Sequence, residues 1–124
     1  RKKGMDGVGE MRNFFAASKE LGLPLEPIFA GGENRTRQDR EQWSSACNFL
    51  AVRPGTIVSY RRNEETLCQL EGAGFRLVPA VNFLAFDDWR EAKHRTVITV
   101  EGSELARGGG GPRCMSLPLR RGAP

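Results

Sequence analysis

The 124-residue chain has few of the residues that build disulfide frameworks, metal sites or membrane spans. Its three cysteines, Cys47, Cys68 and Cys114, are odd in number and widely spaced, whereas zinc ligands come in close pairs and disulfide frameworks need even counts. We therefore interpret all three as thiols and predict no metal and no cofactor. No long apolar run is present, so we predict no membrane span and no membrane partner.

The start of the chain also lacks an apolar signal peptide, which favours the cytoplasm. Residue 1 is Arg1 rather than methionine, so we expect the chain to be part of a longer protein. The net charge is +4, but acidic residues are interspersed and the aromatic residues do not alternate with basic ones, so we predict no nucleic-acid partner. The single histidine, His94, has Lys93 and Arg95 as neighbours, a setting typical of a solvated residue rather than a catalytic base.

Apolar periodicity and turn residues predict an α/β chain. In order, they indicate a helix over 6–21 with Asp6 as N-cap and Gly22 at its end, an edge strand over 23–30, a polar connection, strands over 48–52 and 56–60 around Pro54 and Gly55, a helix over 64–73 capped by Asn63, an extended segment over 75–81, an amphipathic helix or excursion over 82–94, and a strand over 96–100. The side chains expected to pack rather than to act chemically are Leu67, Leu70, Cys47, Cys68, Trp43 and Trp89.

The strongest chemical signal is a run of four glycines, residues 108–111, followed closely by Cys114. Each ordered glycine costs roughly 0.5–1 kcal/mol relative to alanine, so the run is either a loose tail or a place of close backbone approach. Arg107 and Arg113 lie nearby, and a cation beside a thiol lowers its pKa. Cys114 is therefore a candidate nucleophile at the start of an alternating segment over 114–119 that suits a strand; a buried structural cysteine is the alternative.

Residues 102–118, GSELARGGGGPRCMSLP, resemble the C-terminal signature of arginine deiminases, in which the cysteine before Met-Ser is catalytic. Residues 40–43, 48–51 and 54–63 are similar to the segments that precede this signature in the family, in the same order. The resemblance covers about residues 31–121, with an apparent insertion at about 82–95. It implies a partial pentein, the last strand-helix module or modules of a five-module α/β propeller.

On this resemblance, residues 1–124 form the C-terminal part of a single catalytic domain. Residues 1–32 would be the helix and edge strand of a preceding module, and 33–121 the final module. The full-length protein is expected to form a homo-oligomer and to act on L-arginine.

The resemblance also implies a reaction. Cys114 attacks the guanidinium carbon of L-arginine, ammonia leaves, and water hydrolyses the thiouronium intermediate to citrulline. A guanidinium is a poor electrophile, so carboxylates must hold it and a histidine must move protons. The family supplies those groups before the matched region and the chain shows no counterpart, so we expect the isolated chain to be inactive.

The candidate substrate-binding residues are Arg107, Gly108 and Arg113. Gly109 stands where many family members carry an arginine that gates or binds substrate, which leaves Arg113 or the loop backbone to take that role. Two alternatives remain open: a non-catalytic assembly or binding module that uses the segment from Phe83 to Trp89 as a subunit contact, and a related amidinotransferase-type enzyme.

Overall fold

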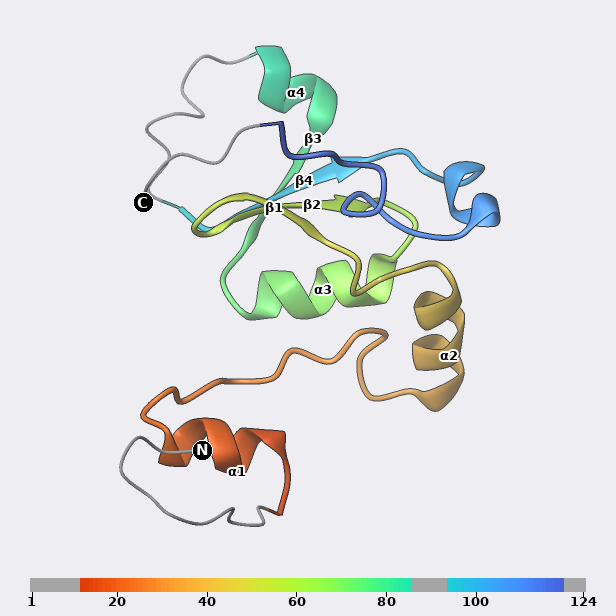
Figure 1. Ribbon diagram of the computed structural model, residues 1–124. Coiled ribbons are helices and arrows are strands. Elements are labelled where there is room, and N and C mark those ends of the chain that lie inside the picture. Colours follow the sequence, from red (N-terminus) through yellow and green to blue (C-terminus); the bar gives the residue numbers. More distant parts are fainter. Residues whose placement is uncertain (1–11, 86–93, 120–124) are drawn as a thin grey trace.

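The computed structural model describes residues 12–85 and 94–119, and a small mixed sheet lies at its centre (Figure 1). β1 (Leu50–Arg53) and β2 (Thr56–Tyr60) form an antiparallel hairpin. β4 (Thr96–Val100) lies between β2 and β3 (Arg76–Pro79) and is parallel to both, so the strand order is β1-β2-β4-β3. The α/β class, the hairpin and the strand over 96–100 are confirmed. The sheet is open, as a part of a larger α/β fold would be.

α3 (Glu64–Gly72) covers one face of this sheet. Ile57, Val97 and Leu77 are register partners on three adjacent strands, so their side chains form a row on the same face. The buried Leu67 and Leu70 of α3 pack with this row, as predicted. The C-terminal segment passes on the other side of the sheet from α3 (Figure 1).

The other helices are short: α1 (Phe14–Glu20), α2 (Arg35–Trp43), α4 (Ala80–Ala85) and the 3-10 helix η2 (Leu105–Gly108). None of the helices in the described ranges combines the length and the apolar character that crossing a membrane requires. α1 begins later than predicted, because Asn13 caps it by accepting the backbone N–H of Ala16; Asp6 lies outside the described residues. Gly22, with φ of +79°, ends it as expected.

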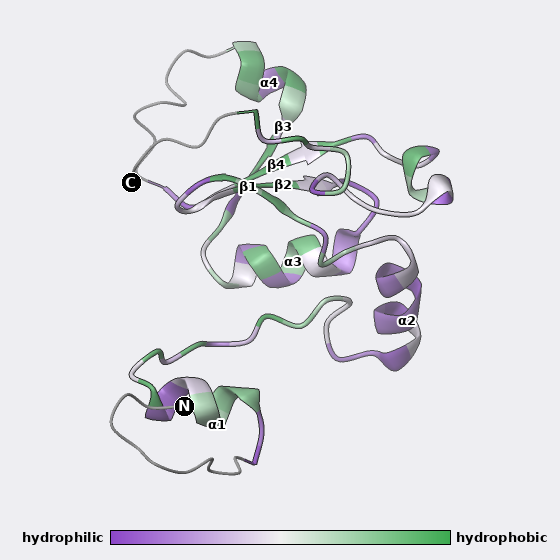
Figure 2. Cartoon of the chain, in the orientation of Figure 1, coloured by the Kyte–Doolittle hydropathy of each residue, from purple (hydrophilic) through white to green (hydrophobic). Residues whose placement is uncertain are grey.

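Two predictions for residues 23–43 are wrong: the edge strand over 23–30 and the polar connection that follows it. Residues 23–30 form no strand, because Pro24 and Pro27 lack backbone N–H groups. In the described part of the chain this segment, called the apolar arm below, joins no sheet (Figure 2). The supposed polar connection after it contains α2, which is hydrophilic along its length (Figure 2) and therefore has no apolar stripe by which periodicity could reveal it. Three side chains expected to pack are also exposed: Trp43, at 87%, and the thiols of Cys47 and Cys68.

The fully buried carboxylate of Glu41 holds α2 against the start of α3. Glu41 Oε1 accepts the backbone N–H of Glu65 at 2.9 Å, and Oε2 accepts the backbone N–H and the hydroxyl of Thr66 at 2.8 and 2.6 Å. Asn63 occupies the N-cap position, as predicted, but its side chain bonds Ser44 instead of capping the helix. An anion at a helix N-terminus satisfies free N–H groups, so Glu41 performs the capping from another helix.

Replacing Glu41 with glutamine should lower the free energy of unfolding by about 1–3 kcal/mol, because the new amide N–H₂ faces a backbone N–H donor. Chemical denaturation at pH 7 measures the change. Glu64→Gln, an exposed carboxyl in the same first turn, is the matched control and should change little.

The loss at Glu41 should also depend on pH. Burial raises the pKa of the Glu41 carboxyl, but hydrogen bonds from Thr66, Glu65 and Arg40 lower it further, so the pKa lies below its ordinary value. A depressed carboxyl pKa stabilises the fold above the unfolded value, about 4.3, and this stabilisation is lost as pH falls through the folded value. The difference between wild type and Glu41→Gln should therefore shrink below about pH 4; a difference that stays constant to pH 2 would contradict the account.

Candidate functional site

Cys114 lies in a turn over residues 112–115, beside the carboxyl-terminal end of β2. The hydroxyl of Tyr60, the last residue of β2, donates to Met115 Sδ at 3.7 Å. Within the turn, Met115 N–H donates to the carbonyl of Gly111 and Ser116 N–H to that of Arg113. The strand predicted over 114–119 is therefore wrong, because these local bonds close a turn. In open α/β sheets, ligand sites form at the carboxyl ends of the strands, which is where this turn lies.

The second half of the glycine run, Gly110 and Gly111, lies so close to Cys114 and Asn48 that it has no room for side chains. Gly109 and Gly110 have φ of +78° and +82°, in the left-handed region that side chains disfavour. A Cβ on Gly110 would lie 3.0 Å from Cys114 Cβ, and one on Gly111 would lie 2.6 Å from Asn48 Cβ. Nothing lies within 4 Å of a Cβ built on Gly108. The run therefore brings the backbone against Cys114 and Asn48.

The side-chain amide of Asn48 contacts Cys114 twice. Nδ2 donates to Cys114 Sγ at 2.8 Å, and Oδ1 accepts the backbone N–H of Cys114 at 3.3 Å. Asn48 is half-buried just before β1, and its own backbone N–H donates to the carbonyl of Ser45. Sequence reasoning missed this partner, because it lies 66 residues from Cys114 and asparagine carries no signal of its own.

These surroundings lower the pKa of the exposed Cys114 thiol. The hydrogen bond from Asn48 contributes most, the backbone of Gly111 adds a second, slight desolvation opposes them, and the charge of Arg113 lowers the pKa further. Hydrogen bonds to the charged form and a nearby cation both favour a thiolate. The alternative of a buried structural cysteine is wrong for Cys114.

The two predicted arginines differ in their surroundings. Arg113 adjoins Cys114 and acts on its pKa, as expected. Arg107 lies in η2, which ends at Gly108, and its Nη1 pairs with Glu104 Oε2 at 2.8 Å on the surface. Both partners of that pair are largely exposed, so it contributes little stability and leaves Arg107 able to exchange partners.

His94 and Cys114 lie near opposite ends of the parallel strands. It precedes β4, and its carbonyl accepts from the hydroxyl of Thr96 at 3.2 Å. Thr96 is the register partner of Thr56, the first residue of β2, whereas the turn with Cys114 contacts the last, Tyr60. Four strand steps separate these ends by roughly 13 Å. His94 is exposed, as predicted, and is placed away from the thiol.

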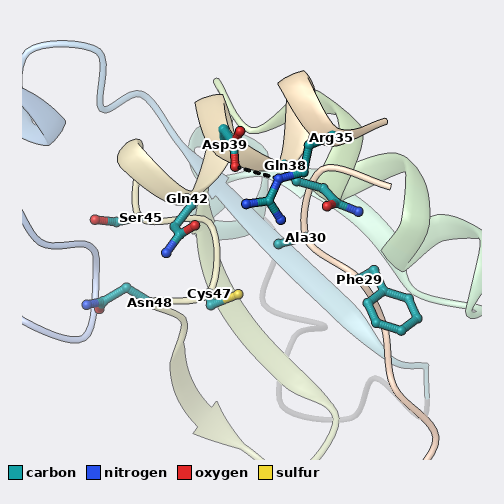
Figure 3. A pocket seen from close by; sticks show the side chains of 9 residues that line it. All are labelled: Phe29, Ala30, Arg35, Gln38, Asp39, Gln42, Ser45, Cys47 and Asn48. Atoms are coloured by element: carbon teal, nitrogen blue, oxygen red, sulfur yellow. Dashed lines mark ion pairs between the residues drawn. The ribbon is translucent and has the colours of Figure 1, made fainter. Parts of the chain in front are cut away.

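A cavity of about 560 Å³ lies between α2 and the apolar arm, next to Asn48 (Figure 3). It is lined by Phe29, Ala30, Arg35, Gln38, Asp39, Gln42, Ser45, Cys47 and Asn48. Figure 3 shows the Asn48 amide directed away from the Cys47 sulfur, so the cavity and the Cys114 turn lie on different sides of Asn48. Nowhere in the described ranges do three His, Cys, Asp or Glu residues gather as a metal would need.

Of the segment proposed as a subunit contact, Phe83 is half-buried in α4 and Trp89 lies outside the described residues.

Comparison with known proteins gives a consistent picture. The family model described as arginine deiminase matches residues 15–121. The chain is 40% identical over 114 residues to the arginine deiminase of Streptococcus uberis, covering 91% of this chain and 22% of that protein. It is 36% identical over 118 residues to the arginine deiminase of Streptococcus equi subsp. equi, covering 94% and 23%, and 36% identical over 106 residues to that of Mycobacterium marinum, covering 86% and 21%. The chain thus spans about a fifth of the length of these relatives.

Proposed function

The chain belongs to the arginine deiminase family, and on that premise we propose that the protein containing it hydrolyses L-arginine to L-citrulline and ammonia, with Cys114 as the nucleophile. The observation that carries the proposal is an exposed thiol with a lowered pKa, held beside the carboxyl end of β2. A thiolate is the reactive form of cysteine, and a planar cationic carbon is an electrophile that it can attack.

The reaction proceeds in two halves. The thiolate attacks the guanidinium carbon, a carbon–sulfur bond forms, and the terminal nitrogen leaves as ammonia after it has gained a proton. Water then attacks the same carbon and loses a proton, the carbon–sulfur bond breaks, and its electron pair returns to sulfur. The products are citrulline and the thiolate of Cys114.

The neighbours of Cys114 suit particular parts of the substrate. We propose the bend over residues 108–111, whose backbone comes close to Cys114 at Gly110, as one wall of the substrate site. Arg113, which adjoins Cys114, carries the same charge as the guanidinium and therefore suits the α-carboxylate of arginine instead. We propose the same role for the exposed side chain of Arg107. Arg107 would exchange Glu104 for that carboxylate.

The isolated chain should produce no citrulline from L-arginine. Proton transfer to the leaving amine needs a group within hydrogen-bond reach of the reacting atoms. The single histidine of the sequence, His94, lies beyond the opposite end of the parallel strands, roughly 13 Å or more away. A colorimetric citrulline assay on the purified chain is the measurement, and turnover at the rate of a complete deiminase would contradict this expectation.

A hybrid enzyme tests the proposed function directly. In it, this chain replaces the matching stretch of the Streptococcus uberis arginine deiminase, 22% of that protein, and the remaining parts supply the other groups. We expect the hybrid enzyme to form citrulline from arginine. A hybrid that melts cooperatively yet forms neither citrulline nor a covalent arginine adduct would refute Cys114 as the nucleophile of a deiminase.

A further inference from the structure

We propose that Asn48 is a positioning residue that holds Cys114 as a thiolate by donating a hydrogen bond that only the charged sulfur accepts well. The part that Asn48 plays in the reaction rests on the proposed function, whereas its effect on the Cys114 thiol does not. It is carried by geometry: one amide contacts both the sulfur and the backbone of the same cysteine.

The orientation of the amide follows from hydrogen-bond chemistry. The backbone N–H of Cys114 is a donor, so the atom of Asn48 that faces it, at 3.3 Å, must be the acceptor Oδ1. The other end of the planar group, Nδ2, is then fixed toward Sγ at 2.8 Å. Nδ2 has two N–H donors and no acceptor, so it offers nothing to an S–H proton and stabilises the deprotonated sulfur.

The backbone around this contact is built to permit it. Gly111 approaches Asn48 so closely that a Cβ would lie 2.6 Å from Asn48 Cβ, 2.9 Å from its carbonyl oxygen and 3.0 Å from Cγ. On the other side, the carbonyl oxygen of Ser45 accepts the backbone N–H of Asn48 at 3.0 Å. Ser45 is a non-glycine residue with φ of +58°. Asn48 is thus held from two directions, and its amide keeps one orientation toward the thiol.

In the reaction, this arrangement acts at both ends of the cycle. Before attack, the Nδ2 donor raises the fraction of thiolate. Once the carbon–sulfur bond has formed, the sulfur has no negative charge and the hydrogen bond weakens. When water has added and that bond breaks, the electron pair returns to the sulfur, which again accepts the hydrogen bond that Asn48 Nδ2 donates.

The test is the pH profile of alkylation of Cys114 in the full 124-residue chain. The chain is treated with iodoacetamide between pH 5 and pH 10, and peptide mass spectrometry follows Cys114 separately from Cys47 and Cys68. Asn48→Ala removes both contacts, and Asn48→Asp keeps the shape and the acceptor for the Cys114 N–H but replaces the donor with an acceptor. Gln42→Ala, which removes a nearby exposed amide that lines the cavity on the other side, is the control.

At pH 7 we expect Asn48→Ala to slow alkylation about fivefold and Asn48→Asp to slow it more, because a carboxylate repels the thiolate. Gln42→Ala should match wild type. The rates of wild type and Asn48→Ala should converge toward pH 10, above the ordinary pKa of a cysteine thiol, about 8.5. Superimposed profiles for wild type and Asn48→Asp, or a deficit of Asn48→Ala that persists at pH 10, would overturn the role of Asn48. If the alanine variant unfolds, the isosteric aspartate variant decides the question.

The outcome is separable from that of the proposed function, because alkylation requires no arginine. Shifted profiles in the chain with no citrulline from the hybrid enzyme would leave the role of Asn48 standing and remove the deiminase assignment. Citrulline formation with unshifted profiles would do the reverse.

Discussion

Replacing Cys114 with alanine in the hybrid enzyme should reduce citrulline formation by roughly a thousandfold or more, because the covalent route then has no nucleophile. Initial rates at saturating arginine measure the loss. Cys114→Ser should be almost as inactive, since a serine hydroxyl beside Asn48 ionises far less readily than a thiol whose pKa is lowered there.

The other two cysteines provide the controls for that result. Cys47 lines the cavity beside α2 and Cys68 lies on the exposed side of α3, so Cys47→Ala and Cys68→Ala should retain most of the activity. Activity that survives the loss of Cys114 but not of Cys47 would move the nucleophile to the cavity of Figure 3 and contradict the proposed site.

Replacing Gly102 with alanine should destabilise the chain by about 2–3 kcal/mol or prevent folding. A Cβ on Gly102 would lie 2.2 Å from Cδ1, 2.5 Å from Cε1 and 2.8 Å from Cγ of Tyr60. The Tyr60 ring is 1% exposed and cannot swing aside, and its hydroxyl contacts Met115, next to Cys114. The added methyl group should therefore push the segment that carries Cys114 off the sheet.

Gly72→Ala is the matched control for Gly102→Ala. Gly72 ends α3, has no positive φ, and nothing lies within 4 Å of a Cβ built on it. An alanine there should be neutral or stabilise the chain by up to about 1 kcal/mol through helix propensity. In urea denaturation, the free energy of unfolding should fall in Gly102→Ala and stay equal or rise in Gly72→Ala. Equal and small changes in both variants would show that Gly102 is not pressed against Tyr60.

Much of the sheet could be predicted from sequence because its signals are local. Pro54 and Gly55 between two β-branched runs predict the hairpin, and Thr96 to Val100 is a β-rich run whose strand is confirmed residue for residue. The spacing of Leu67 and Leu70, the same side chains that pack on the sheet, predicts the helix over 64–73. Apolar spacing reports burial directly, and these elements are held by burial.

The elements that sequence reasoning missed are held by polar contacts between distant residues. α2 has no apolar stripe, and its position depends on the buried carboxylate of Glu41 at the start of α3, 24 and 25 residues further along the chain. Asn48 lies 66 residues from Cys114. A polar side chain gives the same sequence signal whether it is solvated or satisfies a remote N–H, so only the fold distinguishes the two. Resemblance located Cys114; the structure identified its partner.

Trapping the covalent intermediate decides whether the sulfur of Cys114 bonds the guanidinium carbon of arginine. The hybrid enzyme is mixed with arginine, quenched in acid within the first turnover, digested, and analysed by mass spectrometry. We expect an adduct with the mass of arginine less ammonia on the peptide that contains Cys114, and no such adduct in Cys114→Ala. Citrulline formed without that adduct, or an adduct on the peptide of Cys47 or Cys68, would contradict this expectation.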